Sequence, residues 1–188
     1  MIVANEIELA RYCIEFAMKS GASAARLSLN KNVMDSYNIL NGELDKVSHS
    51  ADRSIYIYLY VDGRYGTFST NRLEKKELED FISQAVVMVR MLGEDQFRKL
   101  PDAERTAKDA VTGLELGLCD PAYESYSSEE RLERAKSMSR FSTYKSIQDY
   151  TVLSEECEYA ESSDDTMLID SQGFEGRHRE TSFNCFSE

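Results

Sequence analysis

The fold of this chain is decided by one stretch, IYIYLYVDGRYGTFST, which covers residues Ile55–Thr70. Its first half alternates aliphatic residues with tyrosines, which is the pattern of a strand with two different faces. Asp62-Gly63 supplies a residue pair that tolerates the positive φ angles of a tight hairpin turn, and Arg64–Thr70 returns as a second strand. We therefore predict a hairpin at the edge of an antiparallel meander, with these residues facing the core: Ile55, Ile57, Leu59 and Val61.

A second hairpin is expected upstream of this stretch. Leu27 and Leu29 alternate with polar residues and begin a strand that continues towards Ile39. Asn41-Gly42 is the strongest short signal for a two-residue hairpin turn. We predict a return strand at Glu43–Ser50, separate from the strand that begins at Ile55.

Helical patterns flank the two hairpins. Asn5 followed by Glu8 indicates a capped helix start, so we predict a helix over Glu6–Ser20 that ends at Gly21. An apolar stripe from Leu78 to Leu92, ended by Gly93, predicts a second helix wide enough to cover a sheet. The expected fold class is α+β, an antiparallel meander sheet with helices packed on one face and further strands at the C-terminus.

The second half of the chain carries weaker signals. Residues 94–126 lack periodicity and contain both prolines, so we expect an irregular connection there. Ser127 with Glu130 forms a capping box that begins a third helix reaching Phe141. Three strand-like runs follow, near Tyr150–Tyr159, Thr166–Asp170 and Arg179–Phe186. We predict one domain over residues 1–188, built from a helix-meander-helix core (1–93), the connection (94–126) and a helix with strands (127–188).

Composition excludes several function classes. The chain has 188 residues and a net charge of −12, so its field repels phosphate backbones and nucleic-acid binding is not expected. No apolar run approaches the ~20 residues needed to cross a bilayer. The four cysteines, Cys13, Cys119, Cys157 and Cys185, are widely spaced without a CxxC pair, which is typical of reduced thiols in a cytoplasmic protein.

The reactive side chains form no known catalytic pattern. His49 and His178 are far apart, and neither has the helical partner and glutamate of a zinc peptidase motif. No GxSxG segment is present, and Gly173–Gly176 is interpreted as a turn rather than a phosphate loop. We therefore expect no catalytic, cofactor-binding or metal-binding residue in this chain, and we interpret His49 as a surface or packed residue.

Two further patterns remain open to more than one interpretation. The acidic pairs Asp164-Asp165 and Glu155-Glu156 are expected to be solvated loop charges. Tyr56, Tyr58 and Tyr60 form either the second face of the sheet, covered by a helix or loop, or a docking surface for a partner, since tyrosine offers a large contact area at low entropic cost.

Four segments of the chain resemble the N-terminal domain of the TldD/PmbA family, once described as modulators of DNA gyrase and now as metallopeptidases. They are GASAARLS (Gly21–Ser28), NGELDKVSHS (Asn41–Ser50), YVDGRYGTFSTN (Tyr60–Asn71) and DSQGFEG (Asp170–Gly176). The third is the most specific. Asp170 stands where the family usually has asparagine, and Asp52-Arg53-Ser54 lacks a glycine that the family often has.

This resemblance implies where the chemistry of such a protein lies. In TldD-type subunits a His-Glu-x-x-x-His helix and a later cysteine hold zinc in a following C-terminal domain, which nothing in this chain matches. The expected function is thus the N-terminal domain of a cytosolic metallopeptidase subunit, contributing to the substrate cavity and to assembly with a homologous subunit as a homo- or heterodimer. The peptide substrate would then bind the full-length protein.

One alternative stays open, a stand-alone protein- or peptide-interaction module without enzymatic activity. Direct action on DNA or gyrase is disfavoured by the charge. The chain ends at SFNCFSE (Ser182–Glu188), within an expected strand. We therefore expect it to be the front part of a longer protein, and we expect its last strands to offer an unpaired edge.

Overall fold

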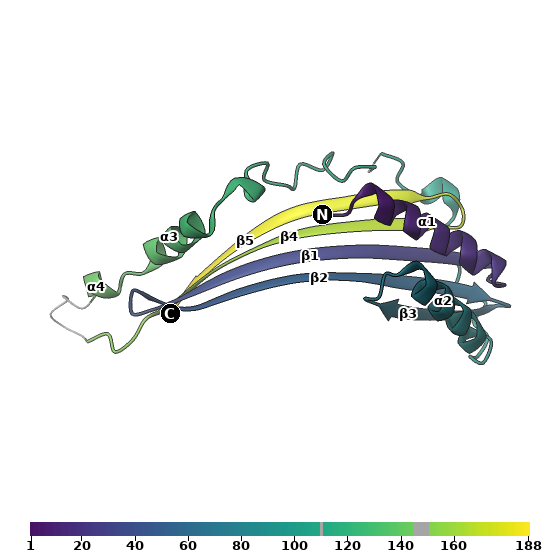
Figure 1. Ribbon diagram of the computed structural model, residues 1–188, viewed down its shortest axis with the longest axis horizontal. Coiled ribbons are helices and arrows are strands. Elements are labelled where there is room, and N and C mark those ends of the chain that lie inside the picture. Colours follow the sequence, from purple (N-terminus) through teal and green to yellow (C-terminus); the bar gives the residue numbers. More distant parts are fainter. Residues whose placement is uncertain (110, 145–150) are drawn as a thin grey trace. The chain divides into compact units, whose positions relative to one another are not determined.

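The computed structural model describes residues 1–109, 111–144 and 151–188. Five strands form one sheet in the order β3-β2-β1-β4-β5 (Figure 1). The elements in chain order are α1 (Ala4–Lys19), β1 (Ala24–Leu40), β2 (Glu43–Val61), β3 (Arg64–Thr70), α2 (Lys75–Val89), the 3-10 turns η1 (Ala103–Arg105) and η2 (Tyr123–Ser125), α3 (Ser128–Met138), α4 (Phe141–Tyr144), β4 (Glu156–Asp170) and β5 (Glu175–Ser187). The predicted α+β class is confirmed.

The two hairpin turns lie where the sequence predicts them. Asn41 and Gly42 have φ angles of 54° and 88°, and Asp62 and Gly63 have φ angles of 48° and 71°. The prediction of two separate strands at Glu43–Ser50 and from Ile55 onwards is wrong, because β2 runs uninterrupted through both. Residues 51–54 are polar but contain neither glycine nor proline, so nothing in the backbone interrupts pairing with β1.

The chain divides into two compact units. Unit 1 contains residues 1–31, 52–117 and 164–179, and unit 2 contains residues 32–51, 118–163 and 180–188. Residues of β1, β2, β4 and β5 belong to both units, because the boundaries fall within these strands.

The core of unit 1 lies between the sheet and the helices α1 and α2. The four aliphatic residues predicted to face the core, Ile55, Ile57, Leu59 and Val61, are at most 2% exposed. α1 covers them with residues that include Ala10 and Ala17, and α2 with its buried stripe Leu78, Ile82, Ala85, Val86 and Val89. Strand β2 therefore presents the face that its alternation predicts.

The ends of the two helices differ from the predictions. α1 begins at Ala4 with Val3 as its cap, where the Val3 N–H donates to the Glu6 carboxylate at 2.9 Å. The predicted cap at Asn5 is wrong, since Asn5 already lies within the first turn. Gly21 confirms the predicted end of α1, with a φ angle of +104°. α2 ends at Val89, before the predicted stop at Gly93.

Unit 2 has a smaller core beneath α3. Its buried residues come from β1, β4 and α3, namely Tyr37, Ile39, Ala135, Cys157 and Tyr159. The predicted capping box is confirmed, because the Ser127 hydroxyl accepts the Glu130 N–H at 3.2 Å and the Glu130 carboxylate accepts the Ser127 N–H at 2.7 Å. α3 ends at Met138, and Phe141 instead begins the short helix α4.

The C-terminal strands are longer than predicted. The runs near Tyr150–Tyr159 and Thr166–Asp170 are one strand, β4, although Tyr150 itself lies outside the described residues. Buried and half-buried side chains alternate along the middle of β4, which the sequence did not predict as strand. Three of the buried positions there are polar: Glu161, Ser163 and Asp165. A hydrophobic alternation cannot reveal such a strand.

The interpretation of the acidic pairs as solvated loop charges is wrong, because Glu156, Asp164 and Asp165 lie on β4, and Glu155 and Asp165 are buried. Asp165 is fully buried on β4, where its carboxylate accepts bonds from Arg177 and from the Ile2 N–H. Glu155 is 3% exposed, and its carboxylate accepts the backbone N–H groups of Arg140 and Phe141 at 2.9 Å. Both carboxylates therefore act as structural acceptors, as burial of a charge requires.

Candidate functional site

A cleft in unit 1 lies where several strand ends meet a loop segment. Its volume is about 720 Å³. Its walls come from the start of β1 (Ser23 and Ala24), the end of β2 (Tyr60), the β2–β3 turn and Arg64, Gln172 of the β4–β5 turn, and residues 98–105 of the connection. The tight turns thus bring segments far apart in the sequence to one end of the sheet.

The β2–β3 turn holds the chain that follows α2 against this end of the sheet. The Gly63 carbonyl accepts the Asp95 N–H at 2.9 Å. The Arg64 guanidinium donates to the carbonyls of Leu92 and Asp62 at 3.0 and 2.8 Å, and to the Glu94 carboxylate at 2.9 Å. These bonds fix the start of the segment that forms one wall of the cleft.

The cleft is cationic although the chain is strongly acidic. Four of its lining side chains are basic, Arg64, Arg98, Lys99 and Arg105, and two are acidic, Asp102 and Glu104. Leu100, only 4% exposed, anchors the segment that carries most of them. A cationic concavity on an acidic protein favours ligands with anionic groups, since the surrounding field repels them elsewhere.

Tyr60 supplies a hydroxyl to the same cleft. Burial raises the pKa of the Tyr60 phenol above its ordinary value, the neighbouring Tyr65 adds to the rise, and the charges of Arg26 and Arg98 oppose it. The phenol therefore stays protonated and can donate a hydrogen bond. The Arg26 guanidinium bonds Asp170 at 3.2 Å, while its buried Nε has no protein partner among the described residues.

A second cleft lies next to the first. Its volume is about 480 Å³, and it shares Ala103 and Gln172 with the larger one. Lys108, Asp170 and Glu175 bring charges of both signs to its wall. Both clefts are lined by residues of η1 and by charged side chains, which suits a ligand with polar groups better than a wholly apolar one.

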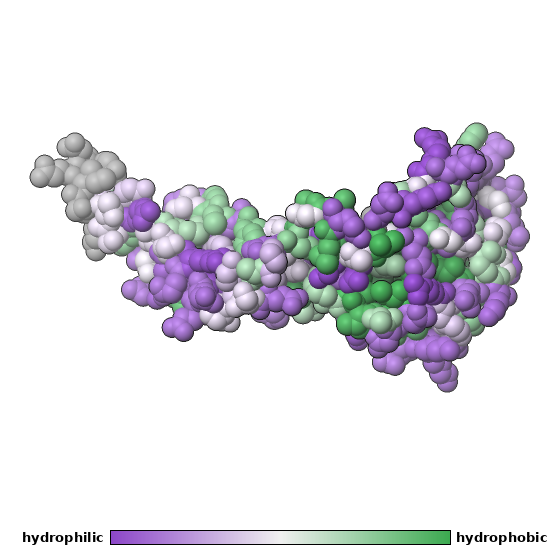
Figure 2. All heavy atoms as spheres, turned by 90° about the horizontal axis from the view of Figure 1, so that it is seen from above, coloured by the Kyte–Doolittle hydropathy of each residue, from purple (hydrophilic) through white to green (hydrophobic). Residues whose placement is uncertain are grey.

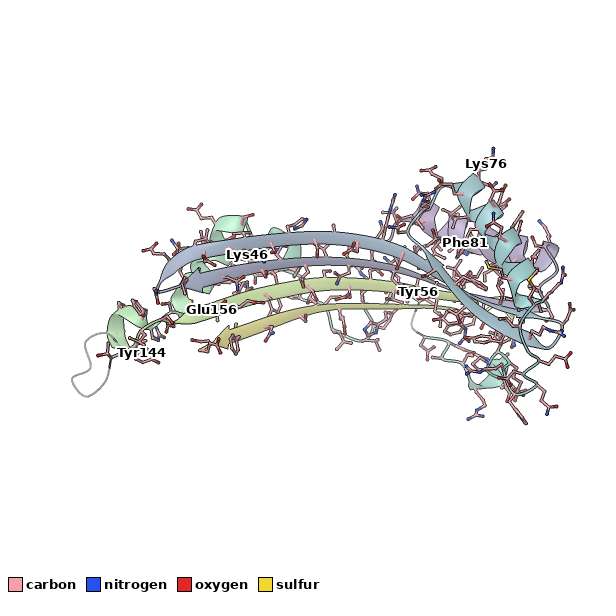
Figure 3. All side chains as sticks on the ribbon, turned by 90° about the horizontal axis from the view of Figure 1, so that it is seen from below. Lys46, Tyr56, Lys76, Phe81, Tyr144 and Glu156 are labelled. Carbon is pink, nitrogen blue, oxygen red and sulfur yellow. The ribbon has the colours of Figure 1, made fainter. Side chains whose placement is uncertain are left out.

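The three tyrosines predicted as a candidate interaction surface lie on the second face of β2. Tyr56, Tyr58 and Tyr60 stand opposite Ser69, Thr67 and Tyr65 of β3. Tyr56 is 42% exposed, and only Tyr60 lines the cleft. Figure 3 labels Tyr56 on β2. The structure thus brings one member of the stripe to the cleft, and a docking role for all three stays a prediction.

The histidines and cysteines are distributed through the fold. His49 Nδ1 lies 2.7 Å from the Asp35 carboxylate of β1. Burial raises the pKa of the Cys13 thiol to about 12, and the Cys157 thiol donates to the Ser187 hydroxyl. Among the described residues, no three histidine, cysteine or acidic side chains are grouped so as to hold a metal ion.

None of the helices in the described ranges combines the length and hydropathy that a membrane-spanning helix needs. Most of the face seen in Figure 2 is hydrophilic, with apolar residues gathered in smaller patches.

Comparison with known proteins identifies the relatives of this chain. Residues 25–89 match the family model described as PmbA/TldA metallopeptidase domain 1. The resemblance to the TldD/PmbA N-terminal domain is confirmed. A search of the curated proteins found no match.

Solved structures extend the similarity beyond the matched residues. A proposed modulator of DNA gyrase from Bacteroides thetaiotaomicron is 28% identical, with a TM-score of 0.87 over 100% of this chain. A proposed modulator of a DNA gyrase from Thermotoga maritima (16%, TM-score 0.67) and TldE from Thermococcus kodakarensis (15%, TM-score 0.69) share the fold over 96% of this chain. The chain spans 41%, 42% and 38% of these three proteins, respectively.

Sequence reasoning missed most of the cleft. Only Tyr60 was singled out in advance, because residues 94–126 show no periodicity from which to place a wall. One signal was available. Arg98-Lys99 is a basic pair next to Leu100-Pro101 in an acidic chain, and such a pair beside a buried anchor indicates an ordered cationic loop rather than a linker.

Proposed function

We propose that this chain is the N-terminal domain of a cytoplasmic TldD/PmbA-type metallopeptidase subunit. One observation carries the proposal: the chain superposes over its full length on a relative from this group, of which it spans only 41%. In this proposal the hydrolytic zinc lies in another domain of the complete protein. The domain described above forms part of the substrate cavity and of the contact with a homologous subunit.

The cationic cleft is the surface of this domain that we assign to the substrate. Peptides carry carboxylates at their C-terminus and on acidic side chains, and Arg98 and Lys99 offer charge to such groups. The protonated Tyr60 hydroxyl can donate to a carboxylate or a peptide carbonyl. The cleft would therefore position the peptide and leave bond cleavage to the other domain.

The experiment compares the complete protein with the 188-residue chain. Peptide hydrolysis is measured for both, with and without a metal chelator, and zinc is measured by elemental analysis. We expect chelator-sensitive hydrolysis by the complete protein, and neither hydrolysis nor stoichiometric zinc for the 188-residue chain. About one tightly held zinc per chain, lost on replacing His49 or His178, would overturn the proposal. An inactive complete protein would favour a stand-alone interaction module.

A substitution in the complete protein tests the cleft. Arg98→Ala removes one of the four basic side chains of the cleft. We therefore expect KM for an acidic peptide to rise roughly three- to tenfold at unchanged kcat, the pattern of lost uniform binding. Lys76→Ala on the exposed side of α2 is the matched control. Equal KM values for Arg98→Ala and Lys76→Ala would exclude the cleft as a peptide site.

A further inference from the structure

Most of the basic side chains around the larger cleft of unit 1 already have acidic partners. Three of the four form ion pairs, at 2.9, 3.5 and 3.5 Å respectively: Arg64–Glu94, Arg98–Asp95 and Lys99–Asp102. These three cations contribute to the field of the cleft but are partly neutralised before a ligand arrives. Arg105 is different, because it is exposed and has no acidic partner among the described residues.

Two uncharged donors in the same cleft are also unengaged. Within the described ranges, the Tyr60 hydroxyl and the Gln172 side-chain amide make no hydrogen bond. Tyr60 is nevertheless held in place, because its carbonyl accepts the Ser23 N–H at 2.7 Å and the Ser23 hydroxyl at 2.8 Å. Its ring packs against that of Tyr65, with 5.1 Å between the ring centroids. The Tyr60 hydroxyl is therefore a positioned donor without an acceptor.

The three free groups together define the ligand that they suit. A guanidinium presents several N–H donors in a planar fork that matches a carboxylate, and a phenol and an amide each add a donor. A carboxylate has two oxygens with about four acceptor positions, so it can take bonds from all three groups. A phosphate group would bring more negative charge into a chain whose net charge is already −12. The carboxylate is therefore the better match.

Glu104 limits how tightly the cleft holds such a ligand. It lines the same cleft beside Arg105 and has no basic partner in the part of the chain that the structure describes. Both residues belong to the 3-10 turn η1, where successive side chains leave the axis about 120° apart. Glu104 thus does not neutralise Arg105 directly, but its charge opposes the arrival of any anion. Its removal should tighten anion binding.

We propose that Arg105, Tyr60 and Gln172 form a carboxylate-binding subsite of this cleft. The Arg105 guanidinium holds the carboxylate, and the Tyr60 hydroxyl and the Gln172 amide each donate a further hydrogen bond. The carboxylate belongs to a peptide, either at its C-terminus or on an acidic side chain. This inference deepens the proposed function, on which the assignment to a peptide substrate rests, whereas carboxylate binding itself needs neither zinc nor hydrolysis.

Isothermal titration calorimetry of the 188-residue chain with three short N-acetylated alanine peptides tests the ligand. The first has a free C-terminal carboxylate, the second a C-terminal amide, and the third a C-terminal amide and a central glutamate. We expect a Kd on the order of 1 mM or below for a carboxylate peptide, and at least roughly tenfold weaker binding of the second peptide. Tight binding of the first peptide alone assigns the subsite to the C-terminus, and tight binding of the third assigns it to acidic side chains.

Substitutions with opposite expected effects test the residues. Arg105→Gln should raise the Kd roughly tenfold, and Tyr60→Phe, which keeps the ring, should raise it roughly three- to fivefold. Glu104→Gln should lower the Kd roughly two- to fivefold. Lys76→Gln and Asp80→Asn make the same changes in net charge at exposed positions of α2, and both should leave the Kd unchanged. Far-UV circular dichroism checks that each variant is folded.

Several results would contradict the subsite. They are equal binding of all three peptides, no saturable binding of either carboxylate peptide up to roughly 10 mM, and tighter binding of inorganic phosphate than of acetate. Arg105→Gln binding as well as Lys76→Gln, or Glu104→Gln binding no better than Asp80→Asn, would exclude the residues named. If the complete protein hydrolyses peptides while this chain binds no carboxylate, the subsite alone is wrong. If this chain binds carboxylates and the complete protein is inactive, the proposed function is wrong and the subsite stands.

Discussion

Replacing Asp165 by asparagine should destabilise unit 1 more than any surface change. The Asp165 side chain is fully buried and that of Arg177 is 14% exposed. The carboxylate accepts the Arg177 Nε–H at 2.8 Å, a second Arg177 bond at 2.5 Å and the Ile2 N–H at 2.8 Å. Asp165→Asn keeps the shape, removes the charge and leaves a buried guanidinium without its counter-ion. Breaking a buried pair in this way costs about 3–5 kcal/mol.

Urea unfolding followed by circular dichroism measures this cost. With an m value of about 2 kcal/mol per M, the midpoint should fall by roughly 1.5–2.5 M. Asp80→Asn, the same change at an exposed position of α2, is the control and should leave the midpoint nearly unchanged. Asp165→Asn combined with Arg177→Met should be less destabilised than the single variant, because the orphaned charge is gone. A midpoint for Asp165→Asn equal to that of Asp80→Asn would refute the reasoning.

The same group predicts how stability depends on pH. Burial alone would raise the pKa of Asp165, but the bonds from Arg177 and Ile2 and the charges of Arg177 and Arg179 lower it below its ordinary value. The contribution of Asp165 to stability is therefore complete above the unfolded pKa of about 4, and it is lost as pH falls through the lower folded value. In Asp165→Asn the stability should fall less steeply at acidic pH than in the wild type.

Two further predictions test burial. Ile57→Ala should lower the free energy of unfolding by about 2–5 kcal/mol, since Ile57 is fully buried between sheet and helices. Tyr56→Ala, on the exposed face of β2, should lower it much less. Equal losses in urea unfolding would mean that the faces of β2 are assigned wrongly. Cys185 is exposed, whereas burial raises the pKa of the Cys13 thiol to about 12. A thiol reagent at neutral pH should therefore label Cys185 before Cys13, which mass spectrometry of peptides can show. Early labelling of Cys13 would contradict its burial.

The elements that the sequence predicts best are those in which local and tertiary preferences agree. The turns at Asn41-Gly42 and Asp62-Gly63 require positive φ angles that few residue pairs accept, and the alternation from Ile55 to Val61 matches a sheet with one buried face. The capping box at Ser127 depends only on neighbours in the sequence. Each of these is determined within a few residues, so one sequence suffices to place it.

The missed features depend on partners that are distant in the sequence. Asp165 is indistinguishable from a solvated acid until Arg177 and Ile2 are placed beside it, 12 and 163 residues away. The polar middle of β2 is a strand because β1 pairs with it and not because of its own composition. The cleft could not be predicted for the same reason, since its walls come from five separate segments, and only Tyr60, Gly63 and Arg64 lie in the patterned stretch Ile55–Thr70.

The bonds between the first and last parts of unit 1 also decide when this protein can fold during its synthesis. Ile2 is held by Asp165, Arg11 by Glu175 and Ala25 by Ser171, so the N-terminal segment acquires its partners only after β4 and the following turn have been translated. A ribosome adding about 5–20 residues per second needs on the order of 10 s to travel from the end of β1 to the end of β4. During that interval β1 has β2 on one side and an open edge on the other. The nascent chain therefore passes through a half-built sheet, and slow codons or pauses between residues 40 and 170 should increase aggregation of this protein far more than pauses elsewhere.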